Sequence, residues 1–134
     1  MVFVIATALL ALMIWRSVPA HAMDDGSYAD SPLKSWFDGL ASGNGPCCSF
    51  ADGISIKDVD WDTGGPNNSY RVRICAVPPD ADETWESCKN KTWIVVPPNA
   101  LVKGPNKYGP AVVWPYAGPD VQTQIRCFLP GSGA

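Results

Sequence analysis

The chain has 134 residues, with 10 Lys and Arg against 13 Asp and Glu, a formal net charge of −3 and one histidine. Nucleic-acid binding requires clustered Lys and Arg to neutralise phosphates, so this acidic, scattered charge argues against nucleic acid as a partner. The histidine, His21, lies in a segment that we expect to be removed. Its loss excludes the catalytic triads and metal sites that need an imidazole, and we expect no metal and no cofactor.

Residues 1–22 have the signature of a secretory signal peptide. An apolar run over residues 2–15 is interrupted only by Thr7, and Ala20-His-Ala22 then forms a small-x-small cleavage site. An apolar run of about 7–15 residues before such a site is typical of cleaved signals. A retained anchor is the alternative, but a membrane span needs about 20 apolar residues. We therefore expect cleavage after Ala22, no stable membrane span afterwards, and a periplasmic or secreted location.

A mobile leader over residues 23–30 is expected to precede a single β-rich domain over residues 31–130. Ser31 suits a helix N-cap, and Pro32 suits the first helical position. An apolar stripe then follows at the i, i+3, i+4 and i+7 spacing of one helix face: Leu33, Trp36, Phe37 and Leu40. We expect this helix to end near Ala41, because the chain beyond it is rich in glycine and proline.

Beyond the helix, the apolar spacing changes to the period of two that is typical of strands. Five strands are expected: residues 54–61 with a bulge, 70–75, 92–96, 111–114 and 125–129. Short strands separated by loops rich in glycine and proline favour a small antiparallel sandwich or a half-open barrel. The predicted fold class is therefore mainly β, with one short N-terminal helix. Residues 131–134 are expected to be a disordered tail.

Five cysteines remain after cleavage of the signal, and in an exported chain they indicate disulfides: Cys47, Cys48, Cys75, Cys88 and Cys127. Cys75 and Cys88 flank one polar loop, so we expect a bond between them at the base of a hairpin. Adjacent Cα atoms lie about 3.8 Å apart, less than the roughly 4.4–6.8 Å of ordinary disulfides, which disfavours a Cys47–Cys48 bond. Cys127 is therefore expected to bond one member of the doublet, and the other member is the odd thiol.

Trp85 is the candidate binding residue. It lies among charged residues in the loop over residues 77–91, whereas Trp36, Trp61 and Trp93 fit the helix stripe or a strand and are expected in the core. Aromatic side chains on a β surface can stack on sugars or on protein partners. We interpret the chain as a non-enzymatic exported binding or structural domain that contacts a protein or an envelope glycan.

Two alternatives from other functional classes stay open. The Cys47-Cys48 doublet would serve a thiol-disulfide or redox-sensing protein, although no Cys-x-x-Cys motif supports thiol exchange. A small envelope enzyme would use carboxylates alone, namely Asp82, Glu83 and Glu86. Their polar loop lacks the apolar setting that raises the pKa of a catalytic acid, so a solvated loop is the simpler interpretation.

Asp58, Asp60 and Asp62 alternate with apolar residues and raise the question of calcium binding. An EF-hand loop starting at Asp58 would need glycine at its sixth position, where Thr63 stands. In a strand the three carboxylates would share one solvated face, and this is the interpretation we prefer.

Six segments together resemble one known family: Trp36–Leu40, Cys47–Ser49 with Asp52, Tyr70–Arg73, Trp93–Pro98, Gly109–Val113 and Ile125–Pro130. The chain resembles the short, uncharacterised exported proteins of alphaproteobacteria related to rhizobia, a family that brings no established activity. The resemblance implies a Gram-negative periplasm. In that family a cysteine usually occupies the positions of Gly53 and Trp114, which implies that one disulfide is absent here and that Cys75–Cys88 is an addition.

Overall fold

The computed structural model of the chain describes residues 29–48 and 52–133. The described part is mainly β, with eight strands in two three-stranded antiparallel sheets and one two-stranded hairpin. The predicted signal peptide over residues 1–22, and most of the predicted leader, lie outside the described residues. No helix within the described residues is long and apolar enough to cross a membrane.

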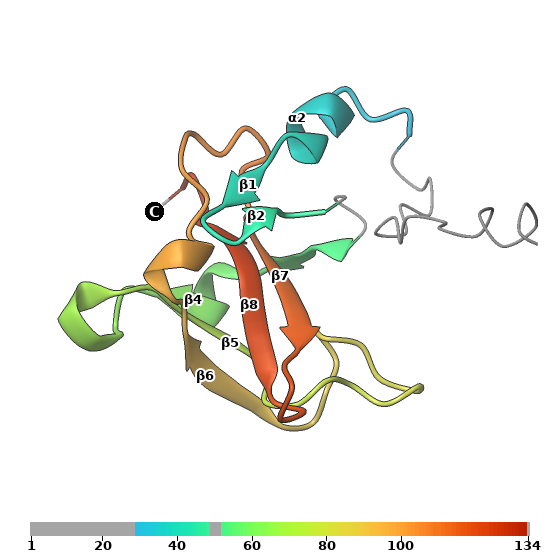
Figure 1. Cartoon of the computed structure of the whole chain (residues 1–134), viewed down its shortest axis with the longest axis vertical. Helices are drawn as coiled ribbons and strands as arrows, with labels where there is room; N and C mark the ends of the chain where they lie inside the picture. The colour runs from blue at the N-terminus through green and yellow to red at the C-terminus, as the bar shows by residue number, and fades with distance from the viewer. Residues whose placement is uncertain (1–28, 49–51, 134) are drawn as a thin grey trace, which may run out of the picture.

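The two three-stranded sheets contain six of the eight strands. One sheet has the order β3–β7–β8, with β3 (Ile54–Ile56), β7 (Ala111–Ala117) and β8 (Thr123–Leu129). The other has the order β4–β5–β6, with β4 (Trp61–Asp62), β5 (Arg71–Cys75) and β6 (Lys91–Val95). The β7–β8 hairpin runs down the middle of the molecule in Figure 1. Both of its strands extend beyond the ranges predicted from the sequence.

The single bulged strand expected over residues 54–61 is wrong, because this segment forms two strands in different sheets. β3 pairs with β7, a 3-10 turn over Asp58–Asp60 redirects the chain, and β4 pairs with β5. Val59, at the position where the alternation fails, lies in that turn and is 70% exposed. Because β4 covers only the first two residues of β5, a seam opens between β3 and the rest of β5.

The main core lies between the two sheets. Phe128 is fully buried at its centre, with its ring centroid 5.4 Å from that of Tyr70 and 6.0 Å from that of Trp61. The other large members come from both sheets: Ile54, Ile56, Val72, Ile74, Val113 and Ile125. At one end the Thr123 N–H donates to the Ala76 carbonyl at 3.0 Å, which joins the two sheets through the backbone.

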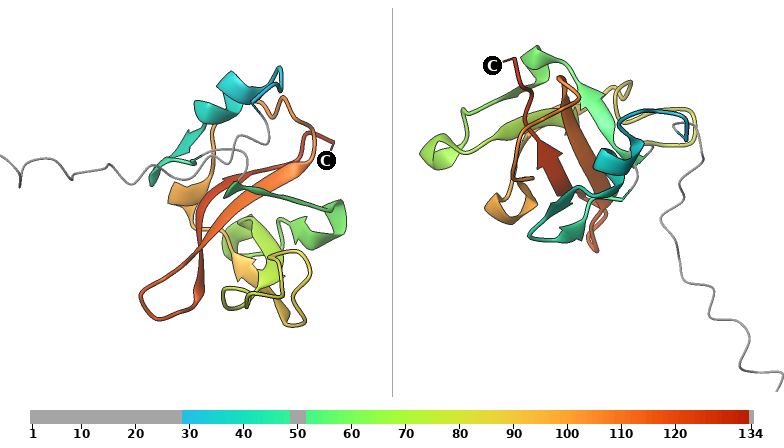
Figure 2. Two further views of the ribbon diagram at one scale, coloured as in Figure 1. Left: turned by 90° about the vertical axis from the view of Figure 1, so that its right-hand side faces the viewer. Right: turned by 90° about the horizontal axis from the view of Figure 1, so that it is seen from above.

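A third layer covers the opposite face of the β7–β8 hairpin, and both views of Figure 2 show it across that hairpin from β4–β5–β6. It consists of α2 (Lys34–Asp38), β1 (Ala41–Ser42) and β2 (Gly45–Pro46). Instead of a helix reaching Ala41, the structure has one five-residue helical turn that ends at Asp38, with Gly39 as its C-cap, because the chain then enters the unexpected β1–β2 hairpin. The apolar side chains of this third layer form a second core with those of β7 and β8. The buried members are Phe37, Leu40 and Cys47 from the layer, and Val112, Trp114, Cys127 and Leu129 from the two strands.

A bulge in β8 attaches this layer to the sheet. The pairing shifts between Trp114 and Pro115, which leaves Arg126 without a partner on β7. The carbonyl of Arg126 accepts hydrogen bonds from Ser42 Oγ at 2.8 Å and Asn44 Nδ2 at 3.0 Å. The Arg126 Nε also donates to the Pro46 carbonyl at 2.6 Å. The carbonyl and the side chain of the bulged Arg126 therefore hold the β1–β2 hairpin in place.

Disulfides are present, as the cysteine count predicted. Cys47 is bonded to Cys127 across 80 residues, and Cys75 is bonded to Cys88 across 13 residues. Cys48, a non-glycine residue with a φ of 70°, is a free, partly buried thiol. The first bond joins the third layer to β8, and the second closes the loop that follows β5.

Gly131 and Ser132, which belong to the segment expected to be a disordered tail, lie against Trp61 and the start of β7. The Ser132 N–H donates to the Gly109 carbonyl at 2.9 Å. A Cβ atom on Gly131 would lie 3.0 Å from the Trp61 ring and 3.3 Å from the Ala111 nitrogen, so glycine permits this close approach. Backbone contacts therefore extend beyond Pro130.

Candidate functional site

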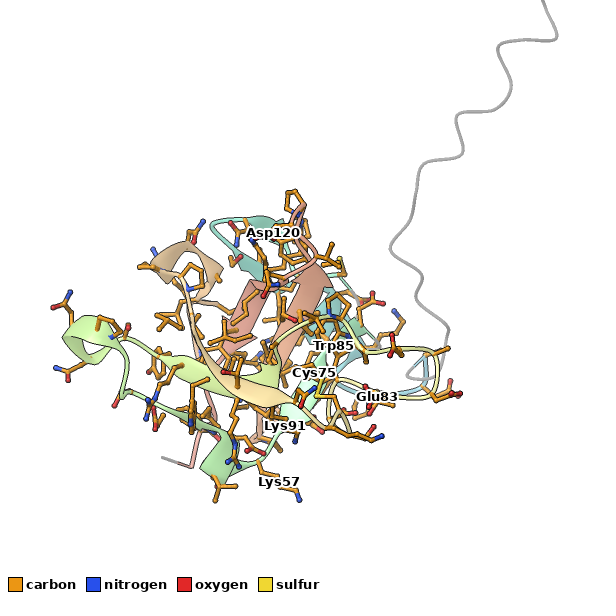
Figure 3. All side chains as sticks on the ribbon, turned by 90° about the horizontal axis from the view of Figure 1, so that it is seen from below. Lys57, Cys75, Glu83, Trp85, Lys91 and Asp120 are labelled. Carbon is orange, nitrogen blue, oxygen red and sulfur yellow. A yellow bond between two sulfur atoms is a disulfide. The ribbon has the colours of Figure 1, made fainter. Side chains whose placement is uncertain are left out.

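The loop between β5 and β6 places Trp85 at the seam between the sheets. The Cys75–Cys88 bond closes this loop, and the Trp85 carbonyl oxygen lies 3.2 Å from Cys75 Sγ. The Thr84 and Ser87 side chains hydrogen-bond to each other at 2.9 Å, and the Ser87 N–H donates to the Thr84 carbonyl at 3.1 Å. Figure 3 shows Trp85 beside Cys75, with Glu83 farther out on the loop. A disulfide and a tight turn therefore fix the backbone at Trp85, and its side chain packs against the main core.

Trp85 forms one wall of a pocket of about 160 Å³ in this seam. The apolar part of the pocket comes from β3 and β5: Ile54, Ile56 and Ile74. The charged part comes from four separate segments: Lys57, Asp60, Arg73, Glu86 and Lys91. The pocket thus combines an aromatic wall and an apolar floor with charges of both signs.

The electrostatics of the pocket leave a surplus of positive charge. Asp60, which is 7% exposed, forms an ion pair with Arg73 at 2.6 Å. Within the described residues, Lys57, Lys91 and Glu86 have no ion-pair partner. Three basic side chains against two acidic ones leave a net charge of +1, so an anionic group would find Lys57 and Lys91 without ion-pair partners among the described residues, with Glu86 as the one unpaired acidic side chain of the pocket.

The volume restricts the size of a ligand. Sites for drug-sized molecules usually measure about 300–1,000 Å³. The pocket therefore suits one ring or one side chain, with the rest of a larger ligand outside it.

The tryptophans divide differently from the sequence-based expectation. Trp85, expected outside the core, is partly buried and packs against the main core while it lines the pocket. Trp93, expected in the core, is 37% exposed on the outer face of β4–β5–β6, so this prediction is wrong. The reason is that Trp93 faces the same side of the sheet as the polar residues Arg71 and Arg73. Trp61 is buried and Trp36 is partly buried in their predicted cores.

Of the three candidate carboxylates in this loop, the structure places only Glu86 in the pocket. Asp82 and Glu83 do not line it. The second carboxylate there is Asp60, which the structure buries where the sequence suggested a solvated face. No group of three or more His, Cys, Asp and Glu side chains in the described part of the chain is placed to hold a metal ion.

Sequence reasoning missed the charged members Asp60 and Arg73 of the site, and the two lysines Lys57 and Lys91 as well. One signal was available, because the Asp60/Asp62 and Arg71/Arg73 pairs share the i, i+2 spacing of one strand face. Opposite charges at that spacing on neighbouring strands favour cross-strand pairing. The structure has both pairs, with Arg71 bound to both Asp62 carboxylate oxygens at 2.6 and 2.9 Å.

Comparison of the chain with protein-family models, with curated proteins and with solved structures finds no match.

Proposed function

We propose that this chain is an exported, non-enzymatic binding domain whose Trp85 pocket holds a carboxylate-bearing sugar unit of an envelope glycan. The observation that carries the proposal is the combination of the Trp85 wall with the unpaired lysines Lys57 and Lys91 in one small pocket. An exported domain would meet such glycans at the cell surface or in the periplasm.

The chemistry of a sugar ring matches each part of this pocket. An aromatic side chain offers an apolar face on which the C–H face of a sugar can stack. Hydroxyl groups need both donors and acceptors, and the pocket offers the Arg73, Lys57 and Lys91 donors beside the Glu86 and Asp60 acceptors. Three basic side chains against two acidic ones favour a sugar that carries a negative charge.

The arrangement of the cysteines supports a structural role over thiol exchange. Cys47 and Cys127 are both 0% exposed, so an external thiol has no access to the bond between them. A reactive cysteine needs an accessible thiolate in an electropositive setting. Cys48, the free member of the doublet, is partly buried beside that bond.

Two disulfides are compatible with an extracellular or periplasmic protein, because such bonds persist in oxidising compartments. We expect the mature chain to begin at Met23. The intact mass of the protein recovered from the periplasm or medium checks this directly. A recovered chain that still contained residues 1–22 would favour a retained anchor.

Replacing Trp85 with Ala is expected to weaken binding of D-glucuronate by about tenfold or more, because the stacking surface is lost. The affinity is measured by titration calorimetry or ligand-detected NMR on the mature protein. Trp93→Ala is the matched control, since it removes an indole outside the pocket, and we expect it to leave the affinity unchanged.

D-Glucose is the matched ligand, because it differs from glucuronate at the carboxylate. We expect wild-type protein to prefer glucuronate, and the Lys57→Met/Lys91→Met variant to lose this preference while it keeps the stacking wall. Equal affinity of the wild type for both sugars would contradict the charge argument. Equal loss in the Trp85 and Trp93 variants would contradict the location of the site.

A further inference from the structure

β6 is the outer strand of its sheet, and one of its edges is not paired within the described residues (Figure 1). The Val96 N–H donates to Tyr70 and the Asn90 carbonyl accepts from Ala76, so even-numbered residues of β6 are hydrogen-bonded to β5. The alternation of an antiparallel ladder then turns the N–H and C=O groups of Lys91, Trp93 and Val95 towards the open edge. Three consecutive odd-numbered residues thus present six backbone groups to another chain.

The outer face beside this edge carries an ordered aromatic side chain. Trp93 lies 37% exposed, with the Arg71 guanidinium 4.4 Å and the Arg73 guanidinium 5.7 Å from its ring centroid. Each arginine is held by an aspartate, Arg71 by Asp62 and Arg73 by Asp60. The hydrogen bond from Arg71 keeps the pKa of the Asp62 carboxyl below its ordinary value, so that pair stays ionised. Trp93 is therefore restrained before any ligand arrives.

The side chains along the edge indicate what kind of chain would fit. Val95, 45% exposed, extends the apolar surface of Trp93. Lys91, at the other end of β6, has no ion-pair partner among the described residues, and the exposed Lys89 precedes it. A strand that lies along β6 would meet apolar surface at one end and uncompensated positive charge at the other.

We propose that β6 accepts an extended, acidic segment of a partner protein as an additional antiparallel strand. This goes beyond the sugar-binding function, because it uses the open edge and Trp93, and it shares only Lys91 with the Trp85 pocket. Backbone hydrogen bonds to residues 91, 93 and 95 supply affinity, as in other cases of strand addition. Apolar side chains of the segment lie beside Trp93 and Val95, and an acidic one lies beside Lys91.

A second copy of this chain fits the edge less well. In a two-fold antiparallel pairing about Trp93, Lys91 would lie opposite Val95 of the second copy and gain no acidic partner. Stable interfaces also bury about 1,200–2,000 Å² in total, more than two five-residue edges offer. An acidic partner segment satisfies the charge that self-pairing leaves unpaired.

The test uses the mature protein and a synthetic peptide, acetyl-Thr-Val-Thr-Val-Thr-Glu-Thr-Glu-amide. In antiparallel register its second valine lies opposite Trp93 and its first glutamate opposite Lys91. Two control peptides are matched to it, one with lysine in place of both glutamates and one N-methylated at the second valine. We expect each control to bind about tenfold more weakly or worse, because one loses charge complementarity and the other a backbone donor.

Amide hydrogen exchange locates the peptide on the protein. In the free protein the amides of Thr92 and Ile94 should be protected and those of Lys91, Trp93 and Val95 should exchange fast. The peptide should slow the exchange of the Lys91, Trp93 and Val95 amides.

Val95→Pro should abolish peptide binding, because it removes a backbone donor at the open edge and leaves the hydrogen bonds to β5 intact, whereas Val95→Ala should preserve binding. Melting curves of both variants check that they are folded.

Three results would overturn the proposal. One is that all three peptides bind the protein with equal affinity, or that none of them binds. Another is binding that leaves the exchange of Lys91, Trp93 and Val95 unchanged. The third is protection of these amides without peptide that rises with protein concentration together with a dimeric mass, which would assign the edge to a second copy.

Discussion

Loss of the Cys47–Cys127 disulfide is expected to lower the free energy of unfolding by about 4–5 kcal/mol, the chain-entropy estimate for closing a loop of roughly 80 residues. The bond spans 80 residues and joins the residue that follows β2 to β8, so it restricts most of the described chain in the unfolded state. Both cysteines are fully buried in the second core, so their removal also disturbs the packing of the third layer. Urea unfolding of a Cys47→Ala/Cys127→Ala variant measures the effect.

The matched control is Cys75→Ala/Cys88→Ala, which opens a bond that spans only 13 residues. Its expected cost is about 3 kcal/mol, because a shorter closed loop restricts the unfolded chain less. Both variants are made with Cys48→Ser, so that the free thiol cannot form a substitute bond. An equal cost for the two variants, or no cost for the first, would contradict the structural role given to the long-range bond.

Replacing Phe128 with Ala is expected to cost about 3–5 kcal/mol, the usual range for a fully buried phenylalanine. The ring is 0% exposed and contacts the aromatic rings of Tyr70 and Trp61 across the sheet interface. Its removal leaves a cavity between two sheets whose backbone bonds restrict collapse. Urea unfolding of Phe128→Ala gives the number.

Tyr116→Ala is the control for this substitution. Tyr116 lies on the neighbouring strand β7 but is 45% exposed, so we expect a change within about 0.5 kcal/mol. If Phe128→Ala cost no more than Tyr116→Ala, the core between the sheets would not lie where the structure places it.

The sequence predicted the strands well where a strand alternates cleanly or is continuously apolar. The alternation of Tyr70, Val72 and Ile74 gave β5, and the run ending at Val96 gave β6. Periodicity describes one segment at a time, however, and it carries no information about which strands are neighbours. The division of residues 54–61 between two sheets therefore could not be read from it.

The candidate site was predictable only in part for the same reason. The position of Trp85 among charged residues singled it out, and the two flanking cysteines indicated a closed loop. Asp60 and Arg73 join it because β4 ends after two residues and leaves the seam open. Trp93 was expected in the core and is exposed instead. The local sequence pattern of an aromatic residue in a strand is the same whether its side of the sheet is covered or open to solvent.

The most direct test of the proposed binding site is a ¹⁵N NMR titration that follows the indole N–H signals of the mature protein. Trp36, Trp61, Trp85, Trp93 and Trp114 each give one such signal, and single substitutions assign them. The sugar-binding account predicts that D-glucuronate shifts the Trp85 signal in a saturable manner, that D-glucose has a smaller effect, and that the Trp93 signal stays in place. A Trp85 signal that does not move at saturating glucuronate, or a shift confined to Trp93, would contradict it.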